Sequence, residues 1–402
     1  MAVLRARFIS IVFPITVILA SCATVDVPET TEANLPEPAQ VREEVTEVTA
    51  PDYDEGFRAY ERGDYASALR QWDPLARQGD AQSQRNLGNM YQQGRGVPKD
   101  HTEAVRWYRF AAEQGYAPAQ NDLGVMYSIG HGVPQDHVEA MRWFRSAAER
   151  GDASAQNNLG GMYSNGLGVS QSYADAIGWF RLAAAQGNEA AQRNLGLTYQ
   201  HGWGVPEDHA EAIRWYRLAA EQGFADAQDN LGWMYFNGKG TKKDYAEAIR
   251  WYRLAAAQGH AGAQTALGFM HETGQGVPQN HPEAVRWYRL AAAQGLPTAQ
   301  YNLGNMYVNG WGIPQNYAES ARWYRLAAEQ GDADAQRSLG VLYATGRGVN
   351  RNNVMAHKWA NLAAAHGDEL ARELREKVAS RMSAPEVTQA QRLAQRWLAG
   401  RE

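Results

Sequence analysis

The sequence predicts an all-α fold, a solenoid in which pairs of helices stack one on the next. One observation is a repeat of 36 residues that recurs without insertion through most of the chain. A second is the presence in every repeat of two apolar patterns at helical spacing. A third is that each apolar stripe is too narrow to bury its helix alone, so neighbouring repeats must complete the core.

Eight tryptophans and a recurring Leu-Gly pair fix the register of the repeat. The pair runs from Leu87-Gly88 to Leu339-Gly340. The tryptophans are Trp107, Trp143, Trp179, Trp215, Trp251, Trp287, Trp323 and Trp359. The apolar stripes of the second repeat are Ala119, Leu123, Met126 and Tyr127, then Ala140, Trp143, Phe144, Ala147 and Ala148. Because such spacings place side chains on one face of a helix, we expect two helices in each repeat.

A glycine-rich phrase, GRGVPKDHTE in the first repeat, predicts the turn between the two helices. Gly94 stands where a left-handed residue ends a helix, and Gly96 and Pro98 shape the turn. The next slot favours the N-cap of the second helix in every repeat: Asp100, Asp136, Ser172, Asp208, Asp244, Asn280, Asn316 and Asn352. An acid follows three residues later in seven of the eight repeats, at capping-box spacing. We therefore interpret these carboxylates as helix caps and not as paired catalytic acids.

Residues 1–21 have the features of a signal peptide. A basic start, MAVLRAR, precedes the apolar stretch FISIVFPITVILA, which is too short to span a bilayer. The following Leu19-Ala20-Ser21-Cys22 resembles a bacterial lipobox, which implies that Cys22 becomes the first mature residue and carries lipid. Cys22 is the only cysteine, so an intrachain disulfide is excluded. The alternative is an ordinary signal peptide with an incidental thiol.

Residues 22–52 are expected to form a disordered acidic tether, because they are rich in Pro, Glu and Thr and lack aromatic residues. Residues 23–55 hold ten acids and one base, whereas residues 56–402 hold 36 bases and 34 acids. A folded part so close to neutral lacks the basic excess that nucleic-acid binding requires. We therefore expect no nucleic-acid partner.

The repeat A-x-x-x-L-G-x-x-Y-x-x-G-x-G-V-x-x-D-x-x-x-A-x-x-W-Y-x-x-A-A-x-x-G resembles the Sel-1-like repeat, a relative of the tetratricopeptide repeat. The resemblance covers residues 80–367, eight repeats, and implies a right-handed superhelix that binds other proteins. Residues 53–79 resemble a shortened tetratricopeptide-type unit with a shorter loop. Residues 368–402 are expected to form a helical cap over the atypical last repeat.

Motifs that carry chemistry are missing from the sequence. It has no His-Glu-x-x-His, no second cysteine, no phosphate loop with Lys-Ser/Thr and no G-x-S-x-G elbow. We therefore expect no catalytic residues, no cofactor and no metal. Some Sel-1-like proteins rich in cysteine bind or hydrolyse β-lactams, but this chain lacks their paired cysteines.

Candidate partner-binding residues lie on the first helix of each repeat, which lines the concave groove in tetratricopeptide relatives. The slot before the Leu-Gly pair often binds a peptide backbone there; here it holds Asn158, Asn194, Asn230 and Asn302. The alternative is that these amides bond a neighbouring helix. Large apolar residues on the same face are Leu197, Trp233, Phe236, Phe269 and Tyr301. They suggest a binding patch, or alternatively they fill gaps between helices.

The sequence thus favours a non-catalytic scaffold that binds envelope proteins or peptides through a groove centred on repeats four to seven. We expect a membrane anchor at lipidated Cys22; Ala23 after it favours the outer membrane, facing the periplasm, by analogy with enterobacterial sorting. A second hypothesis is binding of peptidoglycan or another carbohydrate, with Trp203, Trp233 and Trp311 as stacking platforms. A third is an enzyme that acts on cell-wall material.

Overall fold

The computed structural model describes residues 50–400, and in this range the chain is entirely helical. Residues 1–49, with the predicted signal peptide, Cys22 and most of the acidic tether, lie outside the described residues. The helices are α1 (Tyr53–Glu61), α2 (Tyr65–Arg77), α3 (Ala81–Gln93), α4 (His101–Glu113), α5 (Ala117–Ile129), α6 (His137–Glu149), α7 (Ala153–Asn165), α8 (Tyr173–Ala185), α9 (Glu189–His201), α10 (His209–Glu221), α11 (Ala225–Asn237), α12 (Tyr245–Ala257), α13 (Ala261–Thr273), α14 (His281–Ala293), α15 (Pro297–Asn309), α16 (Tyr317–Glu329), α17 (Ala333–Thr345), α18 (Asn353–Ala365), α19 (Glu369–Ala379) and α20 (Ala384–Ala399).

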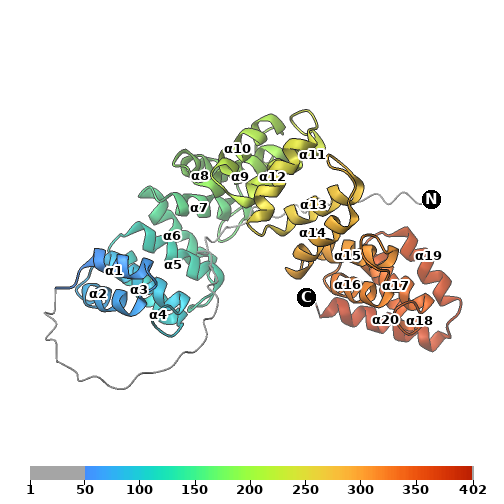
Figure 1. The fold of residues 1–402 in the computed structure, drawn as a ribbon. Coiled ribbons are helices and arrows are strands. Elements are labelled where there is room, and N and C mark those ends of the chain that lie inside the picture. Colours follow the sequence, from blue (N-terminus) through green and yellow to red (C-terminus); the bar gives the residue numbers. More distant parts are fainter. Residues whose placement is uncertain (1–49, 401–402) are drawn as a thin grey trace, which may run out of the picture. The chain divides into compact units, whose positions relative to one another are not determined.

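The chain divides into two compact bodies, one up to Asp208 and one from His209 onward. Helices α1–α9 belong to the first body and α10–α20 to the second. Within each body the two helices of a repeat pack against each other, and each pair packs against the next (Figure 1). The predicted all-α repeat fold is therefore confirmed for the described residues.

The core consists of small clusters that follow one another along the repeats. The second helices of the first seven repeats contribute a fully or nearly fully buried ring directly after the marker tryptophan: Tyr108, Phe144, Phe180, Tyr216, Tyr252, Tyr288 and Tyr324. This ring lies against the glycine of the Leu-Gly pair on the first helix. The marker tryptophans are buried or half-buried beside it. Trp143, for example, belongs to the cluster formed by α4 of the preceding repeat and α5 of its own repeat. The tryptophans therefore join one repeat to the next.

The interhelix loop reaches back to the preceding repeat, a contact that the turn signals did not indicate. Gly168, the second glycine of its loop, has φ 69°. A Cβ there would lie 2.5 Å from the carbonyl oxygen of His137, the first residue of the preceding second helix. No side chain fits that space, so glycine is needed for packing as well as for the left-handed backbone.

Seven of the eight predicted N-caps, all but Asp208, show a side-chain cap bond, but the acids three residues later do not complete a capping box. The Asp136 side chain accepts from the backbone N–H of Val138 and Glu139 at 2.9 and 3.0 Å. Its own N–H is already donated to the carbonyl of Tyr127. Glu139 instead accepts from Arg142 at 2.5 Å and from the indole Nε1 of Trp143 at 2.9 Å. In this repeat the acid therefore holds the marker tryptophan, as Glu247 holds Trp251 at 3.1 Å.

Buried glutamines form hydrogen bonds that link consecutive repeats. Gln156 on α7 donates to the carbonyl of Ala148 on α6 at 3.1 Å. Its side-chain oxygen accepts from Gln186, at the end of the next second helix, at 2.8 Å. The same pair recurs at Gln228 and Gln258, at Gln264 and Gln294, and at Gln300 and Gln330. These bonds satisfy buried polar groups that would otherwise cost stability.

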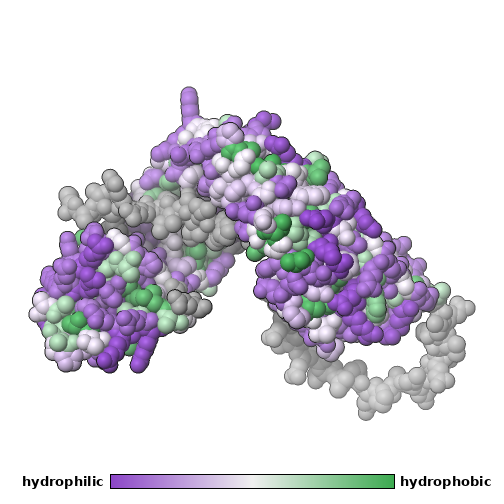
Figure 2. Space-filling model, turned by 180° about the vertical axis from the view of Figure 1, so that it is seen from behind, coloured by the Kyte–Doolittle hydropathy of each residue, from purple (hydrophilic) through white to green (hydrophobic). Residues whose placement is uncertain are grey.

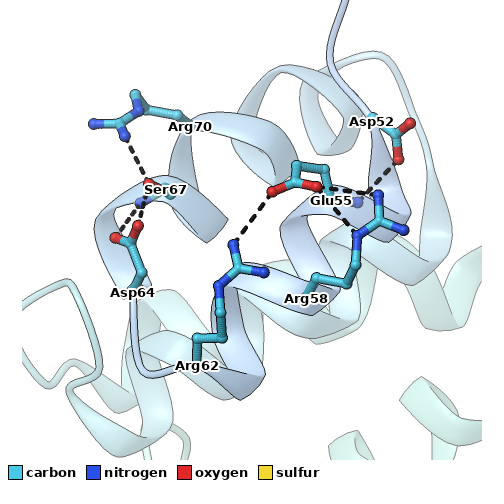
Figure 3. A network of polar contacts seen from close by, with 7 residues as sticks. All are labelled: Asp52, Glu55, Arg58, Arg62, Asp64, Ser67 and Arg70. Carbon is cyan, nitrogen blue, oxygen red and sulfur yellow. Dashed lines mark hydrogen bonds and ion pairs between the residues drawn. The ribbon is translucent and has the colours of Figure 1, made fainter.

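Helix pairs stand at both ends of the repeat array. Near the start, Glu55 on α1 lies 3.0 Å from Arg58 and 3.3 Å from Arg62, in a polar network that also includes the N-caps of α1 and α2 (Figure 3). At the other end, Trp397 on α20 packs edge-on against Trp359, with ring centroids 6.3 Å apart. None of the helices in residues 50–400 is long and apolar enough to cross a membrane.

Candidate partner-binding face

The asparagines that precede the Leu-Gly pair bond the neighbouring repeat in the first body. Asn158 on α7 donates to the side-chain oxygen of Asn121 on α5 at 3.0 Å. Asn194 on α9 donates to Asn157 at 2.9 Å. Both side chains are buried. The structure thus shows the helix-bonding alternative for Asn158 and Asn194, whose amides already serve the packing of first helices.

We call this series of bonds the polar ladder. Each of these bonds joins residues 37 positions apart in the sequence, such as Asn121 and Asn158. In the second repeat the ladder bond is ionic, between Arg85 and Asp122 at 2.6 Å. In these three bonds the two side chains match each other, Arg with Asp once and Asn with Asn twice. This complementarity between adjacent repeats is the signal in the sequence that could have revealed the ladder.

In the second body the series of ladder bonds is interrupted. Asn230 and Asn302 are half-buried, and Ala266 between them has no polar side chain. Asp229 stands 37 residues before Ala266, at the position of the ladder partner. Its carboxylate oxygen lies 3.7 Å from Nδ1 of His260. Asp226, one turn earlier on α11, lies 3.5 Å from Nε2 of the same imidazole. His260 also caps α13 by accepting from the backbone N–H of Ala263 at 3.1 Å.

Three of the five predicted apolar residues come together in the second body. Phe236 belongs to a core cluster against which Trp233 and Phe269 pack. The rings of Phe236 and Phe269 meet edge to face, with centroids 6.1 Å apart. Phe236 is only 7% exposed, so it fills a gap between helices, whereas Trp233 and Phe269 are half-buried and reach the surface.

The other two apolar residues lie elsewhere. Leu197, in the first body, is buried and not exposed as expected. Tyr301 is half-buried and packs with Tyr324, at 5.7 Å between ring centroids, on the core that α16 and α17 form. Burial raises the pKa of the Tyr301 hydroxyl. Of the nine predicted residues, Asn158, Asn194, Leu197 and Phe236 are therefore buried.

The sequence analysis did not identify a half-buried carboxyl group that bonds the ring hydroxyl of Tyr288. The hydroxyl of Tyr288 donates to Glu272 at 2.6 Å. Burial raises the pKa of the Glu272 carboxyl, and this hydrogen bond opposes the rise. Glu272 occupies a slot that holds Gln92, Ser128, Ser164, Gln200, Phe236, Val308 and Ala344 in the other repeats. An acid at a position that is uncharged in every other repeat is the feature of the sequence that could have identified Glu272.

The loop tryptophans stack on residues of neighbouring elements. Trp311 is 38% exposed and lies nearly parallel to the imidazole of His281, with ring centroids 5.4 Å apart. Trp203 stacks on His201 at 4.7 Å and on Tyr173 at 6.1 Å. On the face drawn in Figure 2, hydrophobic residues form separate small patches in a largely hydrophilic surface.

The described residues hold no group of three or more His, Cys, Asp or Glu side chains arranged to bind a metal ion. The polar groups described above are engaged in helix caps, ladder bonds and ion pairs between helices. These regular contacts hold the stacked repeats in place, so that the side chains on the surface of the repeats have fixed positions.

The family model described as the Sel1 repeat matches eight consecutive segments of this sequence: residues 81–116, 117–152, 153–188, 189–224, 225–260, 261–296, 297–332 and 333–368. The chain belongs to the Sel1 repeat family. Sel1 repeat proteins generally mediate protein–protein interaction, and the family is generally non-catalytic. No curated protein gives a significant match to the chain.

Solved structures of Sel1 repeat proteins resemble this one. A Sel1 repeat protein from Oxalobacter formigenes is 34% identical, with a TM-score of 0.57, over 81% of this chain and 93% of that one. A protective antigen of uropathogenic Escherichia coli that displays an SLR fold is also 34% identical, with a TM-score of 0.48, over 86% of this chain and 83% of that one.

Proposed function

We propose that this Sel1 repeat protein is a non-catalytic adaptor that binds partner proteins or peptides on the surface of its first helices. The observation that carries the proposal is the variability of one first-helix slot within an otherwise regular array. Core slots barely change between repeats, whereas this slot holds Asn89, Val125, Gly161, Leu197, Trp233, Phe269, Asn305 and Val341. Leu197 is buried at this slot, whereas Trp233, Phe269 and Val341 are half-buried or exposed. Large apolar side chains that are left partly exposed support a role in recognition.

The second body offers the better binding surface. Trp233 and Phe269 are both half-buried on neighbouring first helices and share one supporting core. Rigid aromatic side chains with one edge exposed are frequent hot spots in protein interfaces. Asn230, beside Trp233 on α11, is half-buried as well and adds an amide that can donate and accept.

A photo-crosslinking amino acid at Thr273 tests this surface in the native cell, because Thr273 is exposed on α13 close to Phe269. The matched control carries the same group at Leu254, which is 42% exposed on the second helix α12. We expect a defined partner to be captured from Thr273 only, and the capture to be lost with Trp233→Ala and Phe269→Ala. Capture from Leu254 alone, or from neither site, contradicts the proposal.

The anchoring part of the proposal rests on the lipobox-like sequence that ends at Cys22. Lipidation would hold the protein at the bacterial envelope, in the outer membrane if Ala23 acts as in enterobacterial sorting. Metabolic labelling with a clickable fatty acid tests it. We expect label in the wild-type protein and none in Cys22→Ser; an unlabelled wild-type protein contradicts lipidation.

A carbohydrate or peptidoglycan ligand is the second candidate, favoured by the exposed ring of Trp311 above His281. A flat aromatic ring supported on one face can stack on a sugar. Sedimentation with purified cell wall is expected to decrease in Trp311→Ala if this function operates. Equal sedimentation of the two proteins counts against it.

A further inference from the structure

The last repeat shows which kind of element can cover the outer side of a second helix. Helix α20 folds back and packs directly on α18 (Figure 1). Under it lie Trp359 and Leu362, at i and i+3 on α18, which are only 2% and 1% exposed. Trp397 of α20 meets Trp359 edge-on, and Ala394 of α20 joins the same core cluster as Leu362. In this fold a Trp-Leu pair of a second helix is thus buried by an amphipathic helix.

The two repeats before the last leave the same Trp-Leu pair partly exposed. The pairs are Trp287 and Leu290 on α14, and Trp323 and Leu326 on α16. Leu290 and Leu326 are 45% and 37% exposed, and both tryptophans are half-buried. We call these four side chains the outer face. Large apolar residues that stay exposed at the same position of adjacent repeats indicate an interaction site.

The arginines directly before the two leucines are directed toward the following first helix. Arg289 donates to the hydroxyl of Tyr307 at 3.4 Å, and Arg325 donates to the hydroxyl of Tyr343 at 2.9 Å. These bonds engage the guanidinium groups away from the leucines. The leucine side chains therefore remain accessible to a partner.

The arginine one turn before each leucine determines how far the outer face extends. Arg322 pairs with Glu319 at 3.5 Å, and its guanidinium carbon lies 5.3 Å from the ring centre of Trp323. The corresponding arginine of α14 also pairs with an acid and lies 5.7 Å from its tryptophan. On α12, by contrast, Arg250 lies 4.5 Å from the ring centre of Trp251, which is buried. The outer face is therefore limited to α14 and α16.

We infer that the outer face binds an amphipathic helix of a partner protein, and that the apolar side of this helix resembles that of α20. The apolar residues of α20 stand at i, i+3, i+4 and i+7: Ala390, Leu393, Ala394 and Trp397. Helices commonly dock on apolar surfaces through anchors at this spacing. The distance between packed helices depends on the side chains at the contact, so the two alanines permit a close approach.

This inference goes beyond the proposed function, because it concerns second helices and not first helices. Either surface can therefore fail its test without the other. The acids beside the outer face are paired with arginines, so the contact is mainly apolar. Because salt screens charges and not apolar contacts, we expect binding to depend little on ionic strength.

A fluorescein-labelled peptide with the sequence of residues 383–400 is the probe, titrated against the complete chain and followed by fluorescence anisotropy. We expect the peptide to bind the wild-type protein. The Kd should rise at least about tenfold in the double variant Leu290→Gln and Leu326→Gln, which removes the exposed anchors. Glutamine favours a helix nearly as well as leucine does, and circular dichroism checks that the fold is kept.

The matched control is Leu254→Gln on α12, an exposed leucine outside the outer face, and it should bind the peptide as the wild type does. No binding to the wild type, or an equal loss in this control, overturns the inference. Equal binding to the wild type and the double variant also overturns it, because the peptide then displaces α20 from α18. A Kd that rises steeply with salt does so as well.

Sedimentation velocity tests a second copy of the chain as the occupant. We expect the wild-type protein and the double variant to sediment alike. If the wild type dimerises and the double variant does not, the outer face serves self-association, and the inference of a partner helix is wrong.

Discussion

The ring of Tyr288 occupies the space that a side chain at Gly268 would need. A Cβ on Gly268 would lie 2.6 Å from Cε1 of Tyr288, well inside van der Waals contact. Gly88 with Tyr108, Gly124 with Phe144 and Gly304 with Tyr324 repeat this relationship. The Leu-Gly pair therefore recurs because each first helix must approach the ring of its own second helix, and not because the first helix bends there.

Gly268→Ala is therefore expected to lower the free energy of unfolding by about 1–3 kcal/mol, the usual cost of overpacking a core. The matched control is Gly178→Ala on α8, where a Cβ meets nothing within 4 Å. That change is expected to stabilise the protein by about 0.5–1 kcal/mol, because glycine disfavours a helix interior. Urea unfolding followed by circular dichroism measures both. Equal effects of the two substitutions would show that the close approach is unimportant.

Trp251→Ala should destabilise the second body by about 3–5 kcal/mol, the cost of removing a large buried aromatic side chain. Trp251 is 3% exposed, and its indole nitrogen donates to Glu247 at 3.1 Å. Leu254→Ala on the same helix is the control, because Leu254 is 42% exposed and its loss should cost no more than about 0.5 kcal/mol. A thermal melting curve of Trp251→Ala that matches wild type would contradict the packing role of the marker tryptophans.

Arg150→Gln is expected to stabilise the protein by about 0.5–1.5 kcal/mol, the net value of one hydrogen bond. Gln120 is buried, and its side-chain oxygen has no partner among the described residues. Arg150 stands where Gln186 donates to Gln156 in the next repeat. It bonds the carbonyl of Gly115 at 3.1 Å instead, at an exposed position where little is lost. The midpoints of urea unfolding compare the stability of Arg150→Gln with that of the wild type. If Arg150→Gln is less stable, the bond from Arg150 to Gly115 contributes more than the new bond to Gln120.

Asp332→Asn should make stability less dependent on pH. Burial raises the pKa of Asp332 from 3.8 to about 6. The folded chain thus binds this proton more tightly than the unfolded chain, and wild-type stability is lost as the pH rises from about 4 through 6. Asn keeps the helix cap, since Asn188 at the same slot accepts from Ala191 at 2.8 Å.

At pH 8 the variant is expected to be more stable than wild type by about 1–2 kcal/mol. A full conversion of the pKa shift would give more, but the helix N-terminus favours the ionised carboxylate. At pH 4 the two proteins should melt at the same temperature. A difference that stays constant from pH 4 to pH 8 would show that ionisation of Asp332 is not the cause.

Sequence alone determined the helix pairs, because their signals are local. The spacing of Ala119, Leu123 and Met126 defines a helix face, and an N-cap such as Asp136 bonds residues two and three positions away. The 36-residue period predicted the fold class. Each helix has only a narrow apolar stripe, and the helices can bury these stripes when successive repeats stack. The family resemblance agrees with the eight matched segments.

Tertiary structure alone decided what the side chains at variable slots do. Asn158 could have faced a ligand or the helix before it, and only its 3.0 Å bond to Asn121 in the preceding repeat distinguishes these roles. The proximity of Asp229 to His260 likewise joins residues from different repeats. Contacts across 30 or more residues depend on how successive helices are rotated and spaced when they pack. A repeating sequence specifies that packing only through the whole set of buried contacts.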